Sequence, residues 1–223
     1  PADVRWMHDV FSNSIAIASF EQAAEELRFR SKIVIEHFGL ADPDFAIEPY
    51  AQTYPFTYPP EEVADLGRSV ERQHPDPERK VDTWVKGFLN GGGQVGTQDL
   101  LVRITKAVHE QFNYRRRHAL GTQTPVETLA LGGGTCRDLA AFMMGAVRAL
   151  GLAARFVSGY LYDPALDTTL VGGGTEEQVR GAGESHAWVQ VYLPGAGWVE
   201  FDPTNGQVGG ANLIRVAVAR EPF

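Results

Sequence analysis

Apolar residues near the N-terminus follow the two-residue period of β-strands. Strands are expected at residues 14–20 and 27–38, and in the second one apolar side chains alternate with arginine, lysine and glutamate. Two strands are too few to form a stable sheet on their own. A proline-rich stretch at residues 50–60 is expected to be an extended linker. We therefore expect residues 1–58 to form a partial N-terminal β-domain with its linker, and residues 59–223 to form a separate core.

From residue 60 the apolar positions recur with the spacing of α-helices. The clearest signals are an apolar stripe in residues 99–112 and a capping box in which Thr124 and Glu127 flank Pro125. A further apolar stripe follows Cys136 and stops at a glycine. The expected helices span residues 61–73, 78–89, 99–112, 125–131 and 136–150.

After the last of these helices the apolar period returns to two. Strands are expected at residues 153–162, 185–193 and 197–202, and the last two are joined by a short turn that contains proline and glycine. Helices followed by antiparallel strands predict an α+β fold. The glycine-rich residues 163–184 are too long for an ordinary connection, and we expect a mobile flap over a substrate cleft.

Composition narrows the class of protein. The fractions of hydrophobic residues (43%) and charged residues (22%) are those of an ordinary globular protein. A net charge of −8 argues against nucleic acid or an anionic membrane as a partner. The chain shows no membrane-spanning apolar run and no signal-peptide pattern, so a cytoplasmic location is expected, while the oligomeric state stays open. One cysteine excludes an internal disulfide framework and a multi-cysteine zinc site.

That cysteine, Cys136, follows a glycine-rich turn and lies in the first turn of a predicted helix. Unpaired backbone N–H groups and the helix dipole favour an anion at such a position. Helix N-termini are also where the pKa of a cysteine falls and where its sulfur becomes a nucleophile at neutral pH. The alternative is a structural cysteine, since free cysteine is among the most buried residue types.

A histidine and an aspartate lie on the two strands of the predicted hairpin. His186 begins one strand and Asp202 ends the other. If the loop holds an odd number of residues, or a bulge adjusts the register, both side chains share a face and their Cβ atoms lie within about 5–8 Å. A two-residue loop without a bulge would separate them. Taken alone, His186 is equally a strand-end histidine with a polar partner, and Asp202 a turn-forming residue before proline. With Cys136 they form a nucleophile, a base and a carboxylate that orients the base.

Four motifs resemble the bacterial branch of the transglutaminase-like superfamily, which includes proteins described as cysteine proteases. They are GTCRDLA at 134–140, ARFVSGY at 154–160, SHAWV at 185–189 and DPTN at 202–205. The resemblance implies a papain-like core, with helices packed on an antiparallel sheet, preceded by a small β-domain. The opening strands of that β-domain are absent here, so we expect a chain shortened at its N-terminus.

The resemblance also implies a reaction. Cys136 would attack an amide carbonyl of a peptide or protein substrate, and the amine would leave a thioester behind. Water as the second reactant makes the protein a cysteine peptidase or amidase, which is the function we expect. An amine as the second reactant makes it an acyltransferase that cross-links proteins or acylates amines. A third reading is a binding or scaffold domain with an idle triad. No metal or cofactor is expected.

Further residues near the triad are candidates for secondary roles. The backbone N–H of Cys136 is the first candidate donor to an oxyanion, and Tyr114 is the second, because animal relatives use an aromatic side chain upstream of the cysteine. Trp188 is placed to line an acyl-binding groove, and Asn205 to hydrogen-bond near the site. Core packing and turn formation account for the same three side chains without any role in catalysis. Asp138 suits the helix dipole and is expected to be structural.

Overall fold

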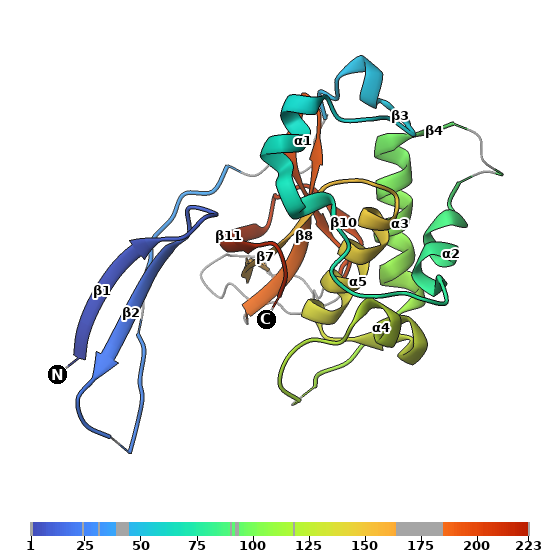
Figure 1. Cartoon of the computed structure of the whole chain (residues 1–223). Helices are drawn as coiled ribbons and strands as arrows, with labels where there is room; N and C mark the ends of the chain where they lie inside the picture. The colour runs from blue at the N-terminus through green and yellow to red at the C-terminus, as the bar shows by residue number, and fades with distance from the viewer. Residues whose placement is uncertain are drawn as a thin grey trace, which may run out of the picture. The chain divides into compact units, whose positions relative to one another are not determined.

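The structure, a computed structural model, divides into two compact units, Pro1–Phe38 and Gly39–Phe223 (Figure 1). It describes residues 2–23, 25–30, 32–38, 45–89, 91, 94–117, 119–163 and 185–222. The flap expected at residues 163–184 therefore lies outside the described residues, apart from Asp163. Among the residues described, no helix is both long enough and apolar enough to cross a membrane.

The first unit is built on an antiparallel hairpin. Strand β1 (Ala2–His8) pairs with β2 (Ser14–Phe20) over the whole length of both. The carboxylate of Asp9 closes the turn, because it accepts hydrogen bonds from the backbone N–H groups of Phe11 and Asn13, both at 2.9 Å. The strand expected at residues 14–20 is confirmed, whereas β1 was not anticipated.

The strand expected at residues 27–38 is wrong. The described residues of this range form no strand, although their apolar and charged side chains alternate. A strand is stabilised by its hydrogen-bonded neighbour and by packing of its apolar face, and here side chains such as Phe29 and Ile33 are 76% and 73% exposed. Alternation alone therefore did not create a strand where no partner pairs with it.

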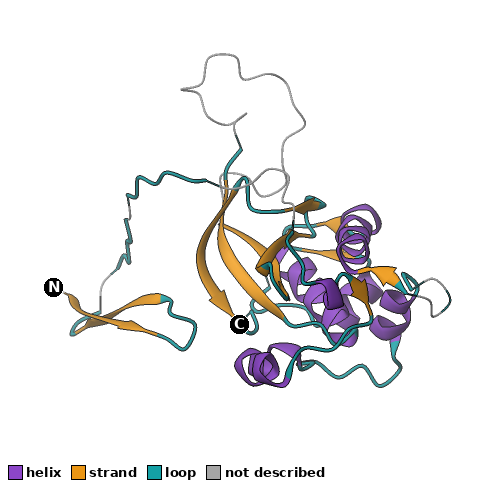
Figure 2. Cartoon of the chain, turned by 90° about the horizontal axis from the view of Figure 1, so that it is seen from above, coloured by secondary structure: helices purple, strands orange, loops and turns teal. Residues whose placement is uncertain are grey.

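An antiparallel five-stranded sheet forms one layer of the second unit (Figure 2). Its strand order is β10-β9-β8-β7-β11. The three strands expected after residue 152 are present within one or two residues of their predicted ends. Neither β10 nor β11 was predicted. The strands are β7 (Ala154–Leu161), β8 (Ser185–Leu193), β9 (Gly197–Asp202), β10 (Gln207–Val208) and β11 (Leu213–Ala219).

Within the described residues, five α-helices precede this sheet along the chain, and α2 to α5 gather on one side of it (Figure 1). The two earliest are shorter than expected. Helix α1 ends at Leu66, and the next residue, Gly67, has a φ of +52° that favours glycine. Helix α2 begins at Lys80, where the Asp76 carboxylate accepts from the N–H groups of Lys80 and Val81. The helices are α1 (Pro60–Leu66), α2 (Lys80–Lys86), α3 (Thr97–Gln111), α4 (Pro125–Leu131) and α5 (Cys136–Ala149).

Helix α5 packs against β8 at the centre of the core. Its Leu139, Phe142 and Met143 have no exposed surface, and they belong to the same cluster as Val189 and Val191 of β8. Each large side chain buried in this way stabilises the fold by about 1.5–3 kcal/mol. This packing fixes the position of α5 relative to β8, the first strand of the hairpin.

Residues 45–58 belong to the second unit. Ile47 and Ala51 are buried in its main core, and the Tyr58 hydroxyl donates to the Tyr192 carbonyl at 2.9 Å while accepting from the Ala153 N–H at 3.0 Å. The chain therefore divides into its compact units after residue 38, whereas the expected boundary lies at residue 58. The short elements of the second unit are η1 (Pro49–Ala51), β3 (Thr53–Tyr54), η2 (Gly67–Val70), β4 (Val95–Gly96), β5 (Asn113–Tyr114) and β6 (Gly133–Gly134).

Candidate active site

Cys136 is the first residue of α5. Thr135 caps the helix: its hydroxyl accepts from the Asp138 N–H at 3.4 Å, and the Asp138 carboxylate accepts from the Thr135 N–H at 2.8 Å. The N–H of a residue at this position is not used by the helix's own hydrogen bonds, and the positive end of the helix dipole lies beside it. Cys136 is buried, with only 9% of its surface exposed. The predicted placement at the first helical turn is confirmed.

Tyr114 is brought next to this turn by a two-residue parallel pairing. Strand β5 pairs with β6, so that Tyr114 lies opposite Gly134, two residues before Cys136. Glycine is required in β6, since a Cβ on Gly133 would lie 2.2 Å from the Asn113 carbonyl oxygen. The backbone therefore places Tyr114 beside the start of α5, and its role toward an oxyanion stays a prediction.

The register of the β8–β9 hairpin decides whether His186 and Asp202 meet. Leu193 pairs with Gly197, which leaves three residues in the loop, and Val189 pairs with Phe201. An odd loop places His186 and Asp202 on the same face as diagonal neighbours. One ring nitrogen of His186, Nε2, lies 2.8 Å from Oδ2 of Asp202. The hydrogen bond that the sequence made conditional on this register is present.

Asp202 is held by several hydrogen bonds and has no exposed surface. Its Oδ1 accepts from the Thr204 N–H at 2.9 Å, and its Oδ2 accepts from the Asn205 side-chain amide at 2.8 Å. Nδ1 of His109, on α3, lies 2.8 Å from the Thr204 carbonyl oxygen. The turn after β9 thus fixes the carboxylate, and the predicted contact of Asn205 near the site is made with Asp202 itself.

His186 is 1% exposed, and its ring stacks on Trp188 with centroids 6.1 Å apart and planes 27° from parallel. Burial is the largest single influence on the pKa of His186 and lowers it. The hydrogen bond to Asp202 and the interaction with Cys136 together outweigh burial and raise the pKa to about 9. The other ring nitrogen, Nδ1, is buried, and among the described residues the ring has no further polar partner than Cys136. Cys136 therefore interacts with a protonated imidazole at neutral pH, and one N–H of that imidazole is left for chemistry.

Trp188 has no exposed surface, so its contact with the site is through the His186 ring. Its indole N–H donates to Glu200, and the other oxygen of Glu200 accepts from the Gln190 amide at 2.6 Å. Burial, which outweighs these hydrogen bonds, raises the pKa of Glu200. Arg155 completes the row, with Nε donating to Gln190 at 2.6 Å. This row of polar side chains was not predicted, because it depends on which residues of three strands lie side by side.

No group of three or more histidine, cysteine, aspartate and glutamate side chains is arranged for a metal ion in the part of the chain that the structure describes. The site as it stands consists of a thiol, an imidazole and a carboxylate on three elements: the start of α5, the start of β8 and the end of β9.

Comparison with known families identifies the class of protein. The sequence model of the Transglutaminase-like superfamily matches residues 84–203. This range is more than half of the chain and includes Cys136, His186 and Asp202. The protein belongs to the transglutaminase-like superfamily, as the motifs predicted.

Individual relatives share part of the sequence. An uncharacterized protein of Mycobacterium leprae is 38% identical over 88 residues, which cover 40% of this chain and 28% of that protein. An uncharacterized protein of Mycobacterium tuberculosis is 30% identical over 128 residues, which cover 55% of this chain and 38% of that protein. The chain thus spans roughly a third of the length of these relatives.

A solved structure shares the fold. A candidate cysteine protease from Cytophaga hutchinsonii superposes with a TM-score of 0.53 at 20% sequence identity, over 77% of this chain and 51% of that one. The predicted α+β fold with a papain-like core is confirmed.

Proposed function

We propose that this protein is a thiol enzyme that cleaves amide bonds of peptides or proteins through a thioester on Cys136, as a cysteine peptidase or amidase. One observation carries the proposal: the buried His186 holds Asp202 through Nε2 at 2.8 Å, while Nδ1 has no other partner among the described residues. A pKa of about 9, to which Cys136 contributes, makes His186 a proton donor at neutral pH. Membership of the transglutaminase-like superfamily supports the same roles.

The first half of the reaction forms the thioester. The Cys136 thiolate attacks the carbonyl carbon of the substrate amide, and the carbonyl oxygen becomes an oxyanion. The backbone N–H of Cys136, with Tyr114 as a second donor, stabilises that charge. The carbon–nitrogen bond then breaks, and the departing amine takes the proton from Nδ1 of His186. Asp202 keeps the ring oriented and stabilises its charged form.

The second half returns the enzyme to its starting state. His186, now neutral, accepts a proton at Nδ1 from a water molecule, and the hydroxide attacks the thioester carbon. The carbon–sulfur bond breaks, which releases a carboxylic acid and the thiolate. If an amine replaces water, the product is a new amide and the protein is an acyltransferase.

A location in the cytoplasm stays a prediction from the sequence.

The test uses trapping of the acyl-enzyme. Incubation with a peptide amide or an activated acyl ester is expected to add one acyl group to Cys136, detected by mass spectrometry, and to release acid. Cys136→Ala is expected to abolish both while the melting temperature stays the same. Asp99→Asn, which changes an exposed ion pair with Arg103 on α3, is the matched control and is expected to retain both.

Two results would contradict the proposal in different ways. Capture of most of the acyl group by a millimolar primary amine would make the enzyme an acyltransferase. Failure of Cys136 to react with any thiol-directed probe in the folded protein would make it a domain with an idle triad.

A further inference from the structure

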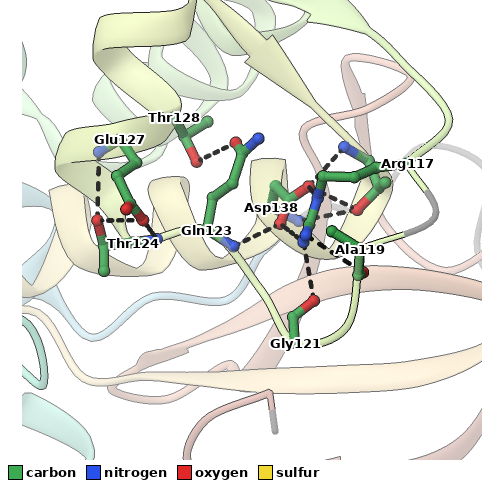
Figure 3. Close-up of polar contacts among 9 residues, drawn as sticks. Arg117, Ala119, Gly121, Gln123, Thr124, Glu127, Thr128 and Asp138 are labelled. Atoms are coloured by element: carbon green, nitrogen blue, oxygen red, sulfur yellow. Dashed lines mark hydrogen bonds and ion pairs between the residues drawn. The ribbon is translucent and has the colours of Figure 1, made fainter.

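A second buried anion lies at the start of α5, two residues after Cys136. Asp138 has no exposed surface. Its oxygens accept from the Gln123 N–H at 2.8 Å (Figure 3). They also accept from the Thr135 N–H at 2.8 Å and from the Thr135 hydroxyl at 2.9 Å. Burial is the largest influence on its pKa and raises it, but these hydrogen bonds and those from Arg117 lower the pKa below its ordinary value. Asp138 is therefore a carboxylate at neutral pH.

The negative charge of Asp138 disfavours a thiolate on Cys136, because two like charges repel each other. Both charges occupy the first turn of one helix and therefore lie at the positive end of the same helix dipole. Two like charges within one helical turn, in a partly buried environment, disfavour each other by about one pH unit. The structure therefore needs a cation to offset Asp138 if Cys136 is to react as a thiolate.

Arg117 is that cation. Its Nη2 lies 2.9 Å from Oδ1 of Asp138, and its Nε lies 3.3 Å from Oδ2, so the guanidinium contacts both oxygens. The side chain is only 20% exposed, and it also donates to the carbonyls of Ala119 at 3.3 Å and Gly121 at 2.8 Å (Figure 3). The loop that leads from Tyr114 to α4 is thereby tied to the N-terminus of α5.

Other charged or titratable groups around Cys136 are already accounted for. His186 of β8 interacts with Cys136 directly, and Asp202 of β9 lies behind His186. Tyr114 lies on the neighbouring β5, and Arg137, the next residue along α5, is exposed. Asp138 takes hydrogen bonds from Arg117, Gln123 and Thr135, and Arg117 is the charged residue of these three, so Arg117 offsets the charge of Asp138.

We propose that Arg117 is a positioning residue for Cys136: it cancels the charge of Asp138 and ties the backbone at Ala119 and Gly121 to the helix start, so that the N-terminus of α5 remains available to the thiolate. This inference rests on the proposed function only in taking Cys136 as the nucleophile. Neither residue was assigned this role from the sequence, because the partners are 21 positions apart along the chain.

The chain has a single cysteine, so alkylation by iodoacetamide reports on Cys136 alone. The experiment measures the alkylation rate against pH for the wild-type protein, for single variants of Arg117 and Asp138, and for the double variant. Arg117→Gln leaves Asp138 uncompensated, and the midpoint of its profile is expected to rise by about one pH unit. Asp138→Asn leaves Arg117 unopposed, and its midpoint is expected to fall by a similar amount. The double variant carries neither charge, and its midpoint is expected to return close to that of the wild-type protein.

The two single variants are expected to shift the midpoint of alkylation in opposite directions, which distinguishes an electrostatic effect from a general loosening of the structure. A purely structural role would shift the midpoints of both single variants the same way, and that result would overturn the proposal. Arg117→Gln is the variant at risk of not folding, because it leaves a buried carboxylate without its cation. In that case Asp138→Asn and the double variant decide: a midpoint for Asp138→Asn at or above the wild-type value refutes the proposal.

Arg117→Lys provides the matched control, because it keeps the charge but loses the two-pronged contact. Its midpoint is expected to stay nearer to wild type than that of Arg117→Gln. The assay follows thiol reactivity and not turnover. A protein that shows the opposite shifts but forms no acyl-enzyme would therefore retain this inference and lose the proposed function.

Discussion

Replacing Asp202 by asparagine tests the electrostatic argument for the His186–Asp202 pair. His186 is buried and its pKa is about 9, compared with about 6.5 for a histidine in an unfolded chain. A group whose pKa is raised by folding stabilises the protein fully below the unfolded pKa, and that stabilisation is lost as the pH rises through the folded pKa. The difference corresponds to about 3 kcal/mol, present below pH 6.5 and lost between about pH 6.5 and 9.

Asp202→Asn removes the charge that raises the pKa of His186 and leaves the burial that lowers it. The variant is therefore expected to be less stable than wild type by about 3 kcal/mol at pH 6, and the loss is expected to shrink strongly at pH 9.5. Urea unfolding at the two pH values measures both free energies. Titration of the His186 ring proton by NMR, assigned among six histidines with a His186→Gln variant, reports the pKa directly.

Asp99→Asn is the matched control for this prediction. It removes a carboxylate from an exposed pair with Arg103 at 2.9 Å, and such pairs contribute little, about 0.5 kcal/mol at either pH. An equal loss of stability for Asp202→Asn at pH 6 and pH 9.5 would refute the reasoning, because it would show that Asp202 stabilises the fold without depending on the protonation of His186.

Two further predictions concern the parts of the fold that hold the site in place. Arg148→Met removes a buried cation that donates to the carbonyls of Ser69 and Ala154 and pairs with Glu221, so the variant is expected to lose about 3–5 kcal/mol in urea unfolding. Adding Glu221→Leu is expected to restore much of that stability, and no recovery would contradict the buried-charge argument. Gly133→Ala places a Cβ 2.2 Å from a backbone oxygen, so a loss of at least about 2 kcal/mol and slower alkylation of Cys136 are expected. Gly210→Ala, with its nearest atom at 3.4 Å, is the control, and an equal effect on the two melting temperatures would contradict the steric reasoning.

The sequence by itself determined the elements that carry the candidate triad. The capping box at Thr124, the apolar stripe after Cys136 and the two strands of the hairpin are local patterns, and the structure contains all of them close to the expected residues. They were predictable because caps, helical periods and turns depend on neighbours only a few residues away. The motifs around Cys136, His186 and Asp202 also indicated the superfamily that the comparison shows.

Tertiary structure decided everything that depends on partners distant in the chain. The alternating residues 27–38 form no strand in the part that is described, because nothing pairs with them, while β11 was missed although it completes an edge of the sheet. The contact of His186 with Asp202 depended on a three-residue loop, and the polar row of Arg155, Gln190 and Glu200 depended on the register of three strands.

The start of α5 shows the division most clearly. Sequence alone placed Cys136 and Asp138 in one helical turn and suggested that the dipole suits an acid there. Only the folded chain brings Arg117 to Asp138 from 21 positions away, and only that contact shows how a buried carboxylate and a reactive thiol share one helix N-terminus. The sequence specified the charges, and the packing of a distant loop against the helix determined how they balance.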